Sequence, residues 1–398
     1  MKRHIFSRFI TITFAILLQV STGAHASSFA ASPVAPIEST LAQGSEVSSA
    51  RLARLRHGIN LSHWFSQSAG NDYSKAHLET HTTAQDIALI KTMGFDHVRF
   101  PIEPAPLLNP ADPGTLNAEY LHYVDNALDV ILAQGLAVIV DIHPTDEFKV
   151  RLNKDDRHVE AFAKFWHALA QHLSVRDPER AFFEVLNEPM VEDGYRWFGI
   201  QGKLISAIRS GAPRHTIIAS GHRWSGPYEL LFLEPYADRN IIYNFHFYDP
   251  FAFTHQGAMW AGPNLPFYKE VPYPSSPEAV MKIMDTIPDE TARYNLLRYG
   301  EDRWSAARID AEIGMVAAWA EKYHVSLTCN EFGAFRRFAR PADRAVWISD
   351  MRSALEKHGI GWAMWDYAGG FSVVNKQNGQ ASPDTETLKA LGLGVQGQ

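Results

Sequence analysis

Two glutamates stand at the ends of apolar segments that resemble buried strands. Glu188 closes the segment FFEVLNE, where Asn187 precedes it and Pro189 follows it. Glu331 closes the segment SLTCNE, 143 residues later in the chain. Proline has no amide hydrogen and a fixed φ, so it stops a strand from continuing inside a sheet. A buried strand that ends in an amide and a carboxylate indicates a functional site at that end.

Other strand-like segments also change from apolar to polar at their C-terminal ends. The polar or aromatic residues found there are Arg99, Asp141, His143, Asn330, His246, Tyr248, Trp365 and Asp366. Because the carboxyl ends of parallel strands meet at one edge or mouth of a sheet, these side chains are expected to converge.

Paired carboxylates at such a mouth are what glycoside hydrolysis requires. One protonates the departing oxygen, and the other attacks the sugar or activates water. A separation of about 5–5.5 Å would retain the anomeric configuration, and about 6.5–9.5 Å would invert it. A nucleophile must stay ionised, so it needs neighbours such as Arg99 and Tyr248, whereas the acid needs a raised pKa.

The elements that would position these residues alternate along the chain. Eight apolar segments predict parallel strands buried on both faces, at 57–61, 97–102, 136–143, 182–189, 216–221, 240–248, 326–332 and 361–367. Helical patterns lie between them, at 82–94, 117–135, 158–173, 196–210, 304–323 and 341–358. This alternation predicts an α/β fold, a single-domain (β/α)8 TIM barrel over residues 51–393. A doubly wound open sheet is the alternative, but no glycine-rich phosphate fingerprint follows the first strand.

The connection after the sixth strand, from residue 249 to about 300, is unusually long for a βα loop. It combines aromatic residues with prolines, which predicts an insertion that forms a wall of a substrate cleft. The candidate contacts are Phe253, His255, Gln256 and Trp260. The alternative is an insertion that packs on itself and covers the side of the barrel.

Aromatic residues make up 12% of the chain, and they include ten tryptophans. Sugar rings have apolar faces that pack on indole rings, so tryptophans near the strand ends are candidates for binding subsites. His63 and Trp64 follow the first strand, and Trp224 follows the fifth strand. Trp166 and Trp347 lie in helical segments and are expected to belong to the core.

At these positions the sequence resembles glycoside hydrolase family 5, the cellulase-type retaining β-glycanases. The resemblance covers about residues 55–370, and the motifs HVRFPI, DIH, LNEP, HFY, NEFG and WAMWDY occur in the order of the family. It implies that Glu188 is the proton donor and later the base, and that Glu331 is the nucleophile. It implies no metal and no organic cofactor.

The resemblance also implies supporting roles for six further residues, namely Arg99, His143, Asn187, His246, Tyr248 and Trp365. Arg99 and Tyr248 would orient the nucleophile and keep it charged. Asn187 would hydrogen-bond the 2-hydroxyl of the sugar under attack, and Trp365 would be its stacking platform. The two histidines would hold the sugar and the carboxylates by hydrogen bonds.

The expected activity is that of an endo-β-1,4-glucanase on cellulose-like or mixed-linkage glucan. A β-mannanase, a xyloglucanase and a β-1,3-glucanase remain open, because distal loops rather than the shared motifs set the choice of glycan. A different class, the non-catalytic carbohydrate-binding barrel, would require the loss of a glutamate, and both are present.

Other chemistries find little support in the residues. The 18 histidines include no HExxH motif, and there is no CxxC motif, so a metal site is not predicted. The nucleophile motif GxSxG of α/β-hydrolases is absent. Cys329 is expected to be a packed thiol that faces the barrel interior below Glu331, and Glu184 is expected to be a buried structural carboxylate.

The N-terminal residues have the pattern of a secretory signal peptide over 1–26. Lys2, Arg3 and Arg8 precede or flank the apolar run FITITFAILLQV, and AHA supplies a cleavage site of small residues. Residues 27–50 are rich in Ala, Ser, Pro and Gly and predict a flexible leader. The expected location is therefore outside the cell or in a periplasm.

Charge and cysteine content narrow the possible partners. Loss of the three basic residues of the signal peptide takes the formal charge from −7 to −10. An acidic surface argues against nucleic acid and anionic membranes as partners. A single cysteine excludes an intramolecular disulfide. A monomer that acts on a polysaccharide is expected.

Overall fold

The computed structural model describes residues 46–395. The predicted signal peptide and most of the predicted leader lie outside these described residues. A short helix, α1 (Ser49–Ala53), precedes the first strand. No helix within the described part of the chain is long and apolar enough to cross a membrane.

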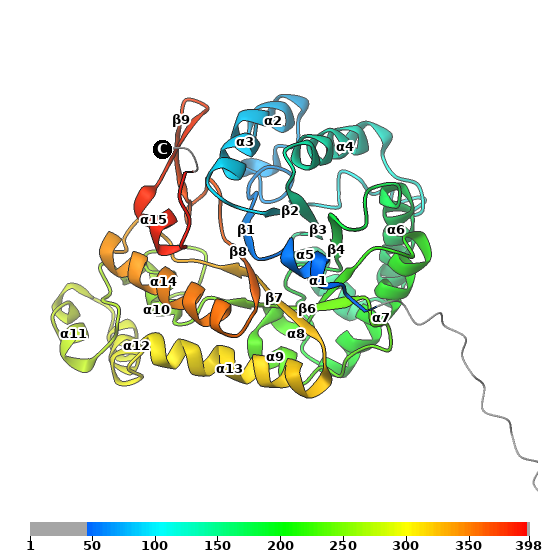
Figure 1. Cartoon of the computed structure of the whole chain (residues 1–398). Helices are drawn as coiled ribbons and strands as arrows, with labels where there is room; N and C mark the ends of the chain where they lie inside the picture. Colours follow the sequence, from blue (N-terminus) through cyan, green and yellow to red (C-terminus); the bar gives the residue numbers. More distant parts are fainter. Residues whose placement is uncertain (1–45, 396–398) are drawn as a thin grey trace, which may run out of the picture. The chain divides into compact units, whose positions relative to one another are not determined.

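Eight parallel strands close into a barrel, in which each strand pairs with its neighbours in sequence and β8 pairs with β1 (Figure 1). They are β1 (His57–Asn60), β2 (His97–Ile102), β3 (Ala137–Ile142), β4 (Ala181–Glu184), β5 (Ile217–Ser220), β6 (Ile241–Phe247), β7 (Ser326–Phe332) and β8 (Gly361–Met364). The predicted (β/α)8 barrel is confirmed.

Strand alternation divides the apolar residues between two cores. Ile139, Phe182, Ile218 and Ile242 form a small cluster inside the barrel, on the side opposite the polar strand ends. Their neighbours in the strands belong to the large cluster between the barrel and the helices. Burial on both faces explains why the strands are almost continuously apolar.

Six long helices match the predicted helical segments: α3 (Ala84–Thr92), α4 (Ala118–Ala133), α6 (Asp156–Leu173), α7 (Gly194–Gly211), α13 (Ala306–Tyr323) and α14 (Pro341–Lys357). The predicted core tryptophans Trp166 and Trp347 are fully buried. Shorter elements lie mostly in loops: η1 (Ala69–Asn71), α2 (Lys75–Thr80), α5 (Asp146–Lys154), α8 (His222–Ser225), α9 (Pro227–Leu231), β9 (Val374–Gln377), β10 (Gln380–Pro383) and α15 (Thr385–Ala390).

The connection between β6 and α13 carries its own helices, α10 (Phe251–Thr254), η2 (Leu265–Phe267), α11 (Pro277–Met281), η3 (Met284–Thr286) and α12 (Glu290–Glu301). Its interior is held by phenol hydrogen bonds, such as that from Tyr268 to the carbonyl of Ala292 at 2.7 Å. Phe253 and Gln256 were expected to contact substrate but are fully buried here. The Gln256 amide bonds Val271 and Phe253 within the segment, so both residues support the loop instead of lining the cleft.

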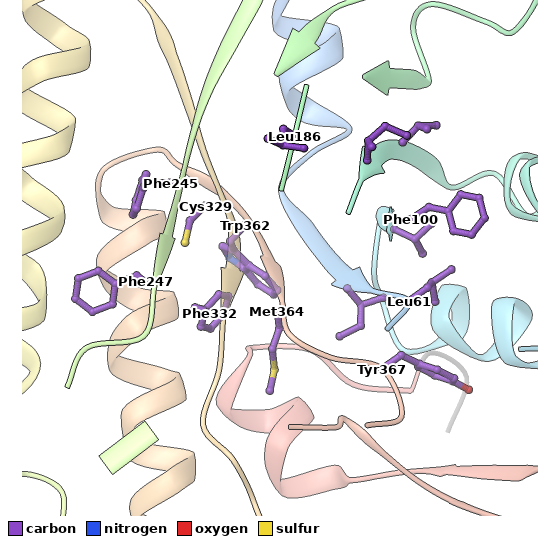
Figure 2. Packing of buried hydrophobic residues seen from close by; sticks show 14 of the residues in the cluster. Leu61, Phe100, Leu186, Phe245, Phe247, Cys329, Phe332, Trp362, Met364 and Tyr367 are labelled. Carbon is purple, nitrogen blue, oxygen red and sulfur yellow. The ribbon is translucent and has the colours of Figure 1, made fainter. Parts of the chain in front are cut away.

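A register shift between β6 and β7 corrects the prediction for Cys329. Phe245 pairs with Cys329, but His246 pairs with Glu331, so Asn330 is an extra residue in β7. Such a bulge interrupts the alternation of side chains. Cys329 therefore packs in the outer core beside Phe245 (Figure 2), and not below Glu331 in the barrel interior.

Candidate active site

The C-terminal ends of the strands open into a cleft with a volume of about 890 Å³. Glu188 and Glu331 both line it, as do residues from the loops after most strands. Its remaining lining is largely aromatic or imidazole: His63, His143, Trp224, Tyr248, Phe251, His255, Trp260, Phe335, Trp365 and Phe371.

Glu188 and Glu331 face each other across this cleft. One oxygen from each carboxylate and one ring nitrogen of His246 all lie within 4.8 Å of one another. This close approach fits a retaining glycosidase, in which about 5–5.5 Å separates the two carboxyl groups, better than an inverting one, in which about 6.5–9.5 Å separates them. The structure thus brings together the two glutamates that the sequence singled out.

Glu188 does not lie in a strand, although the sequence predicted one through residue 189. β4 ends at Glu184, and Glu188 has a φ of 42°, in the left-handed region. Non-glycine residues in this region cost free energy and concentrate at functional sites. The turn lifts the Glu188 side chain into the cleft, where 25% of it is exposed, against 6% for Glu331.

Arg99 is the centre of a buried network beneath the two glutamates. Its guanidinium makes a fork with Glu184 through two bonds of 2.9 Å and lies 2.9 Å from Asp141. It also donates to Glu331 at 2.6 Å. Burial lowers the pKa of Arg99, but these three carboxylates outweigh burial and raise it, so the side chain remains a cation. Glu184 is the buried structural carboxylate that the sequence predicted.

Both oxygens of Glu331 have a fixed partner. Oε1 accepts from Arg99, and Oε2 accepts from the Tyr248 hydroxyl at 2.9 Å. Burial raises the pKa of Glu331, while His246, the positive charge of Arg99 and the Tyr248 hydrogen bond oppose that rise. The Tyr248 hydroxyl stays protonated, because burial and the nearby carboxylates raise its pKa. These donors suit a carboxylate that must attack as an anion.

Glu188 contacts His246, whose Nδ1 lies 2.9 Å from Oε1. Burial raises the pKa of Glu188, as a general acid requires. Burial also lowers the pKa of His246 to about 4, so its ring is neutral at neutral pH. A neutral imidazole can donate to a carboxylate or accept from a carboxylic acid. The contact therefore persists whether or not Glu188 carries its proton.

Asn187 is oriented by bonds at both ends of its amide. Its oxygen accepts from Arg99 at 2.9 Å, and its nitrogen lies 3.0 Å from Nε2 of His143. The other ring nitrogen of His143 lies 3.0 Å from Asp141. Burial lowers the pKa of His143, so the neutral ring donates to Asp141 and accepts from Asn187.

Three of the four tryptophans that the sequence predicted to contact substrate lie at the cleft, and the fourth does not. Trp365 lies at the cleft and stacks on His143, with ring centroids 5.7 Å apart. Trp224 and Trp260 also line the cleft and are 50% and 65% exposed. His63 lines it as well.

Trp64 was expected in the cleft, and the structure places it in the core. It is 5% exposed, and its indole nitrogen donates to the carbonyl of Leu78 at 2.8 Å. Its ring packs against Phe65 and Phe100, so the apolar ring is more completely buried beneath α2 than it would be at the rim. Phe335 and Phe371 line the cleft instead, and sequence reasoning missed both. Their only signal is that each follows a predicted strand by a few residues.

Glu188, His246 and Glu331 are the one group of three potential metal ligands found among the described residues. Both oxygens of Glu331 already accept hydrogen bonds, one of them from a guanidinium. A cation bound here would have to displace the Arg99 guanidinium from Glu331 or be repelled by its positive charge. The donor set therefore fits a carboxylate pair better than a metal site.

The Arg99 network makes a strong prediction about stability. Replacing Arg99 by Met leaves buried carboxylates without their counterion, and such losses cost about 3–5 kcal/mol. We expect Arg99→Met to lower the free energy of unfolding in urea by this amount. Arg157→Met is the matched control, because the Arg157 side chain is 94% exposed and should change stability little. Equal stability of the two variants would contradict the role given to the network.

The closed barrel and the paired carboxylates at its mouth define the class of protein, a glycoside hydrolase of the retaining type. The family model of the cellulases, glycosyl hydrolase family 5, matches residues 57–370. The chain belongs to glycoside hydrolase family 5.

Individual relatives agree with this membership over most of their length. Endoglucanase C of Acetivibrio thermocellus is 28% identical over 347 residues, which cover 85% of this chain and 99% of that protein. Cellodextrinase A of Ruminococcus flavefaciens is 27% identical over 312 residues, covering 76% of this chain and 82% of that protein. The crystal structure of endoglucanase Cel5A of Thermotoga maritima is similar with a TM-score of 0.69 and 26% identity, over 86% of this chain and 98% of that one.

Proposed function

We propose that this protein is an endo-β-1,4-glucanase that hydrolyses cellulose-like or mixed-linkage glucan with retention, using Glu331 as nucleophile and Glu188 as acid and base. The observation that carries the proposal is the approach of the two carboxylates, one held by Arg99 and Tyr248 and the other beside a neutral His246. The names of the relatives supply the glucan as substrate.

The reaction divides into two displacements. In the first, a Glu331 oxygen forms a bond to the anomeric carbon, the glycosidic C–O bond breaks, and Glu188 gives its proton to the leaving oxygen. In the second, Glu188 takes a proton from water, and that water displaces Glu331 from the sugar. Asn187, held by Arg99 and His143, presents its amide nitrogen toward the sugar bound at the nucleophile.

A β-mannanase activity is the second candidate. One solved structure of Thermotoga maritima Cel5A holds mannotriose, and that chain is 25% identical to this one with a TM-score of 0.68. The cleft here has stacking surfaces that accept the apolar face of either sugar. Activity on mannan beside glucan would therefore extend the proposal, and activity on mannan alone would replace its substrate.

The proposal is tested by incubating a protein of residues 27–398 with a panel of polysaccharides and measuring the reducing sugar that is released. The panel contains carboxymethyl cellulose, barley mixed-linkage glucan, xyloglucan, laminarin and mannan, with Glu331→Ala as the control. We expect cleavage of the first two by the native protein and none by the variant. Binding without cleavage of any glycan would instead support a carbohydrate-binding barrel.

The exposed tryptophans predict a separate effect on binding. Trp224→Ala and Trp260→Ala each remove a stacking surface from the cleft, so we expect KM for cellohexaose to rise about tenfold, the equivalent of one lost contact of about 1.4 kcal/mol. Hydrolysis of a short aryl cellobioside should change little. Tyr195→Ala is the control, because Tyr195 is 91% exposed and does not line the cleft.

Export and a monomeric state complete the proposal. The signal-peptide pattern of residues 1–26 supports export to the periplasm or the medium. The test is cell fractionation of the full chain. The N-terminal sequence of the exported form is expected to begin at Ser27, directly after the predicted cleavage site. Light scattering of that form tests for a monomer.

A further inference from the structure

A second, polar cavity of about 230 Å³ adjoins the cleft on the side of α5. Glu188, Asn187 and His143 line it together with Lys149 and Glu103. Lys149 is 4% exposed, so the residue is almost wholly buried where it lines this cavity. The lysine thus lines the same small cavity as the proposed acid and base.

The ammonium of Lys149 has little of its charge neutralised. Among the described residues the only carboxylate within 4 Å of Nζ is Asp146, at 3.7 Å, and the Asp146 side chain is 79% exposed. Arg99, in contrast, is balanced by the buried carboxylates Asp141, Glu184 and Glu331. A buried charge without a close partner acts strongly on its neighbours, because the surrounding dielectric is low.

The position of Lys149 is fixed by the start of its helix. Both oxygens of Glu103 accept backbone hydrogen bonds, one from Ala105 at 3.1 Å and one from Thr145 at 3.0 Å. Glu103 thereby ties the loop after β2 to the residue that precedes α5. Lys149 lies one turn further along, and its amide bonds the Thr145 carbonyl at 3.3 Å.

We propose that Lys149 is a positioning residue that holds a positive charge beside Glu188 and favours the ionised form of this carboxylate, the form that activates water in the second displacement. The inference rests on the proposed role of Glu188. Burial raises the pKa of Glu188, and Lys149 opposes that rise more strongly than His143 or Arg99 does. The lysine therefore limits how far burial can hold the proton on the acid.

Other titratable or charged groups surround Glu188 and set the background for this effect. They come from β2, β3, β6, β7, α5 and the loops after β2, β3 and β6: Arg99, Asp141, His143, His246, Glu331, Asp146, Glu103 and Tyr248. His143 and His246 are neutral at neutral pH because burial lowers the pKa of each. Arg99 and Lys149 are the cations of this set, and of the two only Lys149 has no buried carboxylate among the described residues within 4 Å.

Removal of the charge predicts a shift in the pH profile. In Lys149→Met the Glu188 carboxyl should keep its proton to higher pH. The alkaline limb of the kcat/KM profile should therefore shift to higher pH. One pH unit above the native midpoint, the variant should retain about two to three times the native fraction of its maximal rate. At low pH the second displacement should slow, because less Glu188 is ionised. Lys149→Arg restores the charge and should restore the native profile.

Controls separate this role from a structural one and from substrate contact. Lys154→Met removes the same charge from an exposed position on the same helix and should leave the profile unchanged. A raised KM with an unmoved alkaline limb in Lys149→Met would overturn the proposal and make the lysine a substrate contact. Lys149→Gln, checked by circular dichroism, provides a neutral variant of similar length if the methionine variant does not fold; an unmoved limb in that variant also overturns the proposal.

Failure of the underlying role of Glu188 gives a different result. On an aryl glycoside with a good leaving group, Glu188→Ala should lack the alkaline limb altogether. If that limb persists in Glu188→Ala, it does not report Glu188, and the acid and base assignment is wrong. If the limb is lost there but does not move in Lys149→Met, only the role of Lys149 is wrong.

Discussion

Glu331→Ala is expected to lower kcat on mixed-linkage glucan by at least about 10⁴-fold. Removal of a covalent nucleophile typically reduces the rate of an enzyme by this order of magnitude. The variant keeps Arg99 and Tyr248, which hold the Glu331 carboxylate in the native protein at 2.6 Å and 2.9 Å. It therefore loses the attacking atom while the rest of the site stays in place. Initial rates of reducing-sugar release measure the loss.

Added azide should partly restore cleavage in this variant. The space left by the carboxylate lies beside the Arg99 guanidinium, which favours a small anion. Azide would attack from the face that Glu331 occupied, so an activated β-glucoside should give the α-glycosyl azide, with inverted configuration. Nuclear magnetic resonance of the product identifies the anomer. A β-azide would place the nucleophile on the other side of the cleft and contradict the assignment.

Glu192→Ala is the control for both glutamate variants, Glu331→Ala and Glu188→Ala. Glu192 follows Glu188 in the same loop, its side chain is 75% exposed, and its nearest cation is Arg223 at 3.7 Å. Its replacement should leave the rate on glucan within about twofold of the native value, as expected of a surface substitution. A large loss in this control would mean that carboxylates of the loop act through its fold and not through chemistry.

Glu188→Ala is expected to depend on the leaving group. On polysaccharide, whose leaving alcohol needs a proton, the rate should fall by about 10²–10⁴-fold, the range of general acid catalysis. On a dinitrophenyl cellobioside the first displacement needs little protonation and should remain fast. The intermediate on Glu331 should then accumulate, because the base of the second step is missing. Burst kinetics measure that accumulation.

Azide again gives the diagnostic product for Glu188→Ala. It can replace water in the second displacement without a base, so it should raise the turnover of the activated substrate and give the β-glycosyl azide. The two variants thus predict opposite anomers from one substrate. The same anomer from both would show that the roles of Glu188 and Glu331 are not divided as proposed.

The pH dependence of the native protein follows from the raised pKa of Glu188. Its protonated form is the acid of the first displacement, so kcat/KM should fall as the pH rises through that pKa. Burial raises this pKa, which extends activity toward higher pH than a solvated glutamate would allow. A pH profile of kcat/KM on mixed-linkage glucan measures this limb.

The sequence by itself determined the barrel and its reacting pair. Buried parallel strands require almost continuous apolar segments, and all eight segments are strands of the barrel. Asn187 and Glu331 stand out in the sequence because each is a polar residue at the end of an apolar segment, where it has no packing role. The order of these motifs along the chain then identified the family to which the chain belongs.

Only the tertiary structure decided the surroundings of the pair. Trp64 and Trp224 have similar sequence contexts, but one ring is buried under α2 and the other is half exposed at the cleft. Cys329 faces the outer core because a bulge in β7 breaks the alternation that a sequence pattern assumes. Lys149 reaches the side of Glu188 from a helix of another βα unit. Such positions depend on which loops meet in space, and no local pattern of residues encodes that meeting.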